Sequence, residues 1–86
     1  MFYVYILYSK KLKKRYIGVT EDLKKRIEKH NKGDGSIFTK KGRPWILIHY
    51  QAFLQKEDAY AEEAFFKTGK GRERLKYLLQ HTMEEL

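Results

Sequence analysis

The chain has 86 residues, a net charge of +8 and 15% aromatic side chains, which indicates one folded domain with a modest core rather than a disordered segment. It contains no cysteine, which excludes a disulfide framework and a thiolate metal site. The longest uncharged stretch, residues 44–55, is too short to cross a bilayer, and no signal-peptide pattern is present, so we expect a cytoplasmic protein with no membrane partner.

The first part of the chain predicts two short strands followed by a helix. Residues 2–8 are β-branched and aromatic, which is typical of a buried strand. A polar loop over residues 9–14 leads to a second strand over residues 15–20, which we expect to pair antiparallel with the first because the connection is short. Thr20 is the expected cap of a helix that runs from residue 21 to about residue 31.

The second part of the chain predicts a loop, a strand and two helices. Residues 32–43 contain three glycines and no periodicity, which predicts a loop, and residues 45–53 form the expected third strand. A helix over residues 57–68 is apolar on two sides, so we expect other elements to cover both sides of it. The Gly-Lys-Gly segment 69–71 is expected to break this helix before a last one over residues 72–83.

The order β-β-α-β-α-α predicts an α/β protein of the α+β type. In this architecture, a three-stranded antiparallel sheet is flanked by three helices.

Positive charge is concentrated in the first two thirds of the chain. Residues 1–56 hold 14 basic and 4 acidic side chains, whereas residues 57–86 hold 5 basic and 7 acidic ones. This surface predicts a polyanionic partner, most commonly nucleic acid, and the alternative is a solvated basic surface with no specific partner. Seven basic side chains are the expected nucleic-acid contacts: Lys13, Lys14, Lys25, Lys40, Lys41, Arg43 and Lys67.

Two polar side chains of the first predicted helix are expected to face inward. On a helical wheel, Arg26 and His30 fall beside the apolar stripe of Leu23 and Ile27, while the other basic residues point away from it. The alternative for Arg26 is an aliphatic stem that lies over the edge of the core, and the alternative for His30 is a half-buried imidazole with satisfied hydrogen bonds.

The first two predicted strands place tyrosines near a glycine. Because side chains alternate along a strand, Tyr5 lies on one face of the first strand, and Tyr16 and Gly18 share one face of the second. A glycine inside a strand often marks the close approach of a ligand, while the alternatives are a β-bulge and a tyrosine-lined core.

Glu63 is a candidate metal ligand or general base on the helix predicted over residues 57–68. It falls beside Ala59 and Phe66, which form one apolar stripe of that helix. The alternative is an ion pair with Lys67 one turn later, which would contribute only ~0.3–0.5 kcal/mol.

Together these segments resemble the GIY-YIG nuclease superfamily. The resemblance rests on Tyr-Val-Tyr at residues 3–5, Tyr-Ile-Gly at residues 16–18, and the downstream Arg26 and His30. Residues 61–73 are similar to the family's glutamate helix and the turn after it. The match spans nearly the whole chain. Its first segment is similar to the sequence found in the small single-domain bacterial branch of the superfamily. This branch is related to the catalytic domain of the excinuclease incision subunit.

The resemblance implies an endonuclease that hydrolyses phosphodiester bonds in DNA, in repair or recombination, with one Mg²⁺ or Mn²⁺. By position in the motif, Tyr16 would be the general base, Arg26 would hold the scissile phosphate and Glu63 would hold the metal. Tyr5 and His30 would position water and phosphate. Because an ordinary phenol stays protonated at neutral pH, a tyrosine base needs a neighbouring cation, which Arg26 would supply.

The same resemblance leaves other functions open. We expect a single GIY-YIG domain over residues 1–86. The main alternative to an endonuclease is a DNA-binding module that keeps the fold and does not cleave. A weaker alternative is an adaptor that docks on a repair protein through its acidic C-terminal part. A domain of this size has little surface for reading bases, so we expect little base specificity, recognition of DNA structure, or a protein partner that supplies the specificity.

Overall fold

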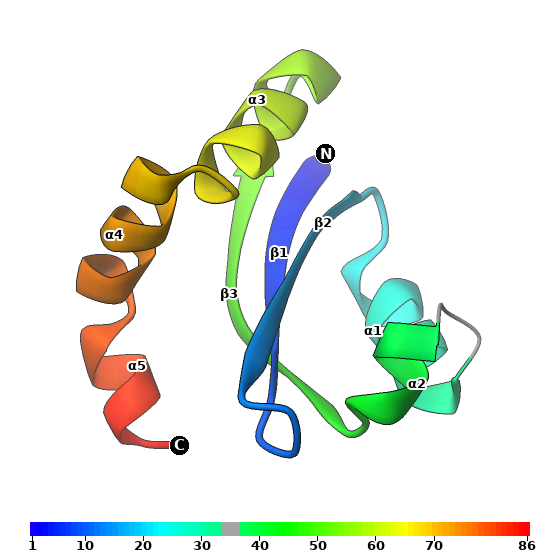
Figure 1. Cartoon of the computed structure of the whole chain (residues 1–86). Helices are drawn as coiled ribbons and strands as arrows, with labels where there is room; N and C mark the ends of the chain where they lie inside the picture. Colours follow the sequence, from blue (N-terminus) through cyan, green and yellow to red (C-terminus); the bar gives the residue numbers. More distant parts are fainter. Residues whose placement is uncertain (34–36) are drawn as a thin grey trace.

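The computed structural model, which describes residues 1–33 and 37–86, is built on a three-stranded antiparallel sheet (Figure 1). The central strand is β1 (Phe2–Ser9), with β2 (Lys14–Thr20) on one side and β3 (Trp45–Phe53) on the other. The predicted sheet is confirmed. The central position of β1 explains its unbroken run of apolar and aromatic residues, since residues 4–7 are fully buried between two layers of helices.

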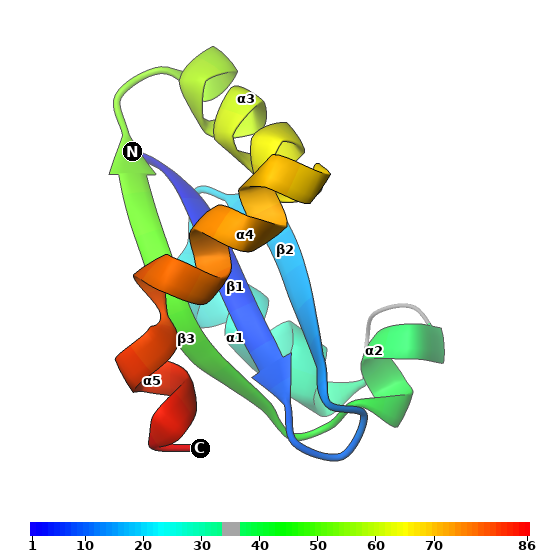
Figure 2. The same cartoon turned by 60° about the vertical axis from the view of Figure 1, so that its left-hand side comes forward.

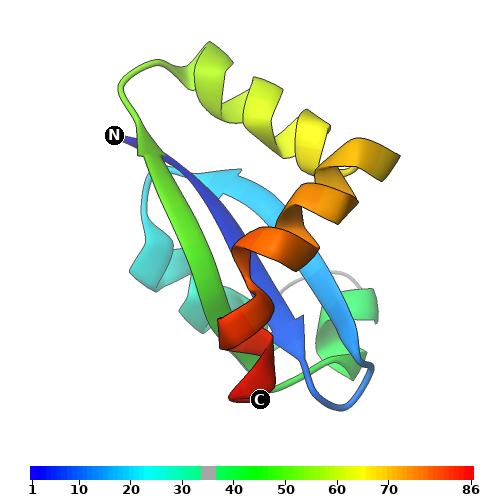
Figure 3. The same cartoon turned by 90° about the vertical axis from the view of Figure 1, so that its left-hand side faces the viewer.

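Helices cover both faces of the sheet (Figure 2). One face carries α1 (Leu23–Lys32) and α2 (Ile37–Lys41). The other face carries α3 (Lys56–Phe66), α4 (Gly69–Leu78) and α5 (Gln80–Glu84), which cross the sheet one after another (Figure 3). The α+β class is confirmed, with five helices in the described chain where three were predicted. Among the described residues, no helix is long and apolar enough to cross a membrane.

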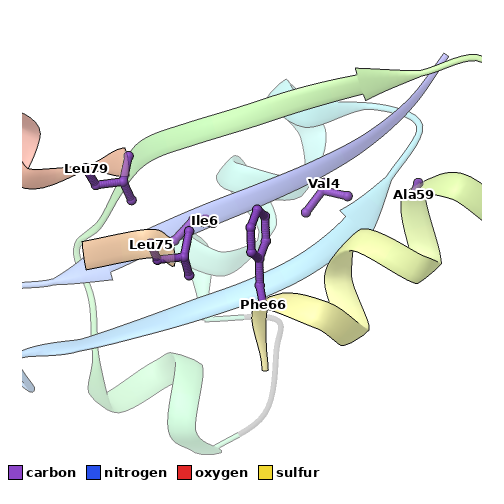
Figure 4. Packing of buried hydrophobic residues seen from close by; sticks show 6 residues of the cluster. All are labelled: Val4, Ile6, Ala59, Phe66, Leu75 and Leu79. Atoms are coloured by element: carbon purple, nitrogen blue, oxygen red, sulfur yellow. The ribbon is translucent and has the colours of Figure 1, made fainter. Parts of the chain in front are cut away.

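The core has one cluster on each face of the sheet. Six residues form the cluster under α3, α4 and α5 (Figure 4): Val4, Ile6, Ala59, Phe66, Leu75 and Leu79. The cluster on the α1 face consists of Tyr5, Leu7 and Trp45. Alternation along β1 therefore sends Val4 and Ile6 to one core and Tyr5 and Leu7 to the other.

The cap of α1 differs from the predicted one by two residues. The Asp22 carboxylate, not the Thr20 hydroxyl, caps the helix and accepts a hydrogen bond of 3.0 Å from the Lys25 amide. The Thr20 hydroxyl is engaged earlier, where it accepts a hydrogen bond of 3.1 Å from the Asp22 amide. Threonine and aspartate are both good helix caps. Here the Thr20 hydroxyl is already used in the turn before the helix, which leaves Asp22 as the cap.

Part of the segment predicted as a loop is a helix. The predicted loop over residues 32–43 contains α2, and its residues 34–36 lie outside the described residues. A hydrogen bond ties α2 to the start of β3, because the Trp45 indole N–H donates to the Thr39 carbonyl at 2.7 Å. A helix of five residues is too short to show the period that predicts one.

The segment predicted to end a helix begins one instead. Thr68 caps α4, and its hydroxyl oxygen accepts a hydrogen bond of 3.0 Å from the Gly71 amide. Gly71 is buried against the end of α3, where a Cβ would overlap the Phe65 carbonyl oxygen. This glycine therefore permits close contact between two helices. The predicted last helix also divides into α4 and α5, since Leu79 departs from helical geometry with φ −110° and ψ 16°.

Only one side of α3 is covered by other elements. Ala59 and Phe66 are buried in the core, as their shared stripe predicts. The second stripe is not covered, because Ala61 and Ala64 are exposed and Phe65 keeps 40% of its surface exposed. The prediction that both sides of α3 are covered is wrong, and small alanines on a solvated face explain the misleading pattern.

Candidate active site

The side chain of Tyr5 crosses over Gly18. These residues are directly paired in the register of β1 and β2, and Tyr5 is fully buried. A Cβ at Gly18 would lie 2.5 Å from the Tyr5 hydroxyl oxygen, so only a glycine leaves room for the phenol. Of the three interpretations of a glycine at this position, the tyrosine-lined core is the correct one. The expected approach of a ligand to its backbone is wrong, and the β1–β2 register shows no bulge there.

Arg26 and His30 approach Tyr5 from α1. As the helical wheel predicts, His30 is buried and Arg26 half-buried, while Lys25 and Lys29 are exposed. A hydrogen bond of 3.2 Å joins the Tyr5 hydroxyl and His30 Nε2. The inward placement of these two residues is confirmed. The alternative of a half-buried His30 with satisfied hydrogen bonds is only partly met, because the ring is buried and its Nδ1 atom has no hydrogen-bond partner among the described residues.

Burial keeps Tyr5 and His30 uncharged. It raises the pKa of Tyr5 to about 12; the electrostatic interactions with Tyr16 and Glu63 act in the same direction, and the charge and hydrogen bond of Arg26 oppose them. The pKa of His30 is lowered, first by burial and then by the positive charges of Arg26 and Lys29. At neutral pH Tyr5 is therefore a protonated phenol and His30 a neutral imidazole.

Tyr16 of β2 stands beside this pair. Its ring meets the His30 ring edge-on, with centroids 4.8 Å apart, and lies 6.3 Å from the Tyr5 ring. On its other side are Phe38, at 6.5 Å, and Trp45, at 6.2 Å. Phe38 is 37% exposed and belongs to α2. Sequence analysis missed this aromatic neighbour because it lies in the segment predicted as a loop.

Glu63 supplies a carboxylate from α3. Its charge acts on the Tyr5 phenol, which places it in electrostatic range of the site. Its side chain is 21% exposed, and its Oε2 lies 3.7 Å from Lys67 Nζ. The predicted alternative, an ion pair one helical turn apart, is therefore present together with the proximity to Tyr5.

The donors at this site fit a magnesium or manganese ion better than zinc. Within the described residues, no three His, Asp or Glu side chains come close enough together to enclose a metal. Zinc usually takes three or four such protein ligands. Mg²⁺ commonly takes one or two carboxylates and fills its other positions with water and phosphate oxygens. Glu63, half-buried and in electrostatic range of the phenol, is a suitable single carboxylate for such an ion.

A basic hollow of about 630 Å³ adjoins Tyr16 along the outer edge of β2. Its wall includes Tyr16 and Phe38 from the α1 side of the sheet, and Phe66 and Leu75 from the α3 side. Five cationic side chains line it: Lys13, Lys14, Arg15, Lys67 and Arg72. Aromatic walls and several cations form a surface suited to a polyanion that carries rings.

Only some of the predicted nucleic-acid contacts line this hollow. Lys13, Lys14 and Lys67 do. The other four, which are exposed outside it, are Lys25, Lys40, Lys41 and Arg43. Two further lining residues, Arg15 and Arg72, were not predicted. Arg72 lies in α4, far from β2 in the sequence, and only the fold brings it to the β2 edge.

A second, smaller hollow of about 180 Å³ lies beside Arg26. Lys56 and Tyr60 of α3 also line it, with the Lys56 ammonium 5.7 Å from the centre of the Tyr60 ring. Tyr60 precedes Glu63 by one helical turn, and Lys67, in the larger hollow, follows it by one turn. The residues one turn before and one turn after Glu63 thus line two different hollows.

Comparison with known proteins identifies the family. Residues 1–77 match the model of the GIY-YIG catalytic domain. A UPF0213 protein of Pediococcus acidilactici is 40% identical over 79 residues, which are 90% of this chain and 80% of that protein. A UPF0213 protein of Streptococcus pyogenes serotype M5 is 40% identical over 84 residues, 96% of this chain and 90% of that protein. The solution NMR structure of a UPF0213 protein from Bacillus halodurans superposes with a TM-score of 0.55 at 37% identity, covering 91% of this chain and 85% of the other. The chain therefore belongs to the GIY-YIG family of nuclease domains.

Proposed function

We propose that this protein is a metal-dependent endonuclease that hydrolyses phosphodiester bonds in DNA. The proposal is supported by one observation above all. Side chains from four separate elements converge at Tyr5, beside a basic hollow large enough for part of a polynucleotide strand. The converging residues are Tyr5, Tyr16, Arg26, His30 and Glu63. A DNA-binding module without catalysis needs the hollow, and the packing of Tyr5 would serve it as well, but it does not need Arg26 and Glu63 directed at the phenol.

The proposed chemistry assigns a different task to each tyrosine. Tyr16 lines the hollow and is the general base of this scheme: in its phenolate form it takes the proton of the attacking water and becomes a neutral phenol. Tyr5 is unsuited to that task, because its raised pKa keeps its proton in place. It acts as a neutral hydrogen-bonding group, held by His30, that positions water or a phosphate oxygen.

The charges beside the tyrosines stabilise the phosphate in this scheme. Arg26 presents a guanidinium whose paired N–H groups match two phosphate oxygens, and it offsets charge that develops in the transition state. Glu63 would hold one Mg²⁺ or Mn²⁺, and such an ion, when bound, stabilises the leaving oxygen. The five cations along the hollow hold the flanking phosphates.

The decisive test is nicking of supercoiled plasmid with Mn²⁺ by the wild type, Glu63→Gln and Glu62→Gln. We expect Glu63→Gln to nick at least ~10-fold more slowly, because it removes the proposed ligand charge. Glu62→Gln is the matched control and should stay within about twofold, since Glu62 accepts a hydrogen bond from Gln51, away from Tyr5. If the wild type and Glu63→Gln both retard DNA in gels and both cleave only at background, the protein is a binding module.

Gly18→Ala is expected to slow cleavage by about 10- to 100-fold while the protein remains folded, because small displacements of positioned groups are costly in catalysis. The added methyl meets only the far end of the Tyr5 side chain, which must move away from His30. Single-turnover cleavage and thermal melting measure the two effects. Wild-type activity in a folded Gly18→Ala protein would show that the position of the Tyr5 hydroxyl is unimportant.

A further inference from the structure

Lys67 lies within reach of two different anionic partners. Its ammonium is 3.7 Å from the Glu63 carboxylate, and its side chain also lines the basic hollow beside Tyr16. The backbone of Lys67 is fixed at the C-cap of α3. Because a lysine stem has four rotatable bonds, the ammonium can turn from the carboxylate to the hollow while the helix stays in place.

The contact between Lys67 and Glu63 is suited to exchange. The Glu63 side chain is 21% exposed, whereas that of Lys67 is 56% exposed, so the carboxylate is the better fixed of the two. Ion pairs this exposed and this long contribute little stability and break easily. The carboxylate oxygen next to the ammonium belongs to the group proposed above to hold the divalent ion.

We infer that Lys67 is the resident counter-ion of Glu63, which a divalent cation replaces, and that the released ammonium then binds a substrate phosphate in the basic hollow. This inference rests on the proposed metal-binding role of Glu63. An ammonium at this position competes for the carboxylate oxygen and repels a divalent cation. Once displaced, it is free to turn toward the hollow, which four other cationic side chains also line.

The inference predicts opposite effects of Lys67→Met on metal and on DNA. In Mg²⁺ titrations of the protein alone, followed by the NMR shifts of amides around Glu63, we expect binding about three- to tenfold tighter than wild type, since one competing charge is lost. DNA affinity measured at saturating Mg²⁺ should fall about threefold, because the phosphate contact of the released ammonium is lost, and without Mg²⁺ it should change much less. The measurement of Mg²⁺ binding does not depend on catalytic activity.

Lys14→Met is the matched control. Lys14 lines the same hollow and makes no ion pair among the described residues. It should lower DNA affinity by about the same factor and change Mg²⁺ affinity by less than about twofold, because an exposed charge without a close partner is screened. Equal Mg²⁺ affinities of Lys67→Met and Lys14→Met would overturn the exchange, since any effect would then come from general charge.

The controls separate the exchange from the function on which it rests. If Glu63→Gln loses the Mg²⁺-induced shifts and Lys67→Met binds Mg²⁺ like the wild type, the exchange is wrong and the metal site stands. If the wild type and Glu63→Gln bind Mg²⁺ equally, Glu63 is not a ligand, and both proposals fall. Tighter Mg²⁺ binding by Lys67→Met but not by Lys14→Met, together with weaker DNA binding by both variants, supports the exchange.

Discussion

Tyr16→Phe is expected to lower the rate of DNA cleavage by about 10²- to 10⁴-fold, the range that a general base contributes. The change removes only the hydroxyl group. The ring remains available for its contacts with His30, Phe38 and Trp45, so the fold and the hollow should be preserved. Single-turnover kinetics with Mn²⁺ measure the rate, and gel retardation measures DNA affinity, which should stay within about twofold of wild type.

Tyr77→Phe provides the comparison for this variant. Tyr77 is 69% exposed on α4 and lines neither hollow, so removing its hydroxyl should leave the rate unchanged. If Tyr16→Phe cleaves as fast as Tyr77→Phe, Tyr16 is not the base. The candidates would then be a metal-bound water acting alone, or another group of the site. A parallel loss of DNA affinity would assign Tyr16 to binding instead.

Gly71→Ala is expected to cost more than about 3 kcal/mol of folding free energy, enough to leave much of a small domain unfolded. The added methyl would overlap the Phe65 carbonyl oxygen and lie near the Phe66 backbone, so α3 and α4 would have to separate. Since Phe66 and Leu75 belong to the same core, that separation would open the core as well. Urea unfolding followed by circular dichroism measures the loss.

Gly69→Ala tests whether the effect comes from contact rather than from the loss of a glycine. Gly69 lies two residues earlier in the same helix, and a Cβ there would meet nothing within 4 Å. The free energy of unfolding of Gly69→Ala should differ from that of the wild type by less than about 1 kcal/mol. A slight increase is favoured, because alanine has a higher helix propensity than glycine. Similar unfolding curves for the two variants would show that α3 and α4 do not meet as closely as the structure has them.

Local patterns predicted the parts of the site that depend on one element at a time. The helical period placed Arg26 and His30 inward among many solvated cations, and burial confirms that placement. Strand alternation placed Tyr16 and Gly18 on one face, which the register bears out. In each case, the position of a side chain follows from the geometry of its own helix or strand.

The parts that sequence did not predict depend on contacts between distant segments. Phe38 reaches Tyr16 because α2 is held by Trp45, and Arg72 reaches the β2 edge because Gly71 allows α4 to turn closely from α3. Neither contact leaves a periodic pattern or a motif in the local sequence. The partner of Gly18 was also hidden, because a bare strand glycine looks the same whether a ligand or a tyrosine fills the space above it.

The burial of Tyr5 in the core has a consequence for how this fold could lose its activity during evolution. A residue that fills the core is retained for stability, whatever the protein does. Glu63 and Arg26 are only half-buried, so selection for folding constrains them less. Among descendants of such a domain, the inward tyrosine would outlast catalysis, and the first changes after its loss would fall at the arginine and the glutamate. Those two positions, rather than the tyrosine, are therefore the ones to inspect when a related chain is suspected of binding DNA without cutting it.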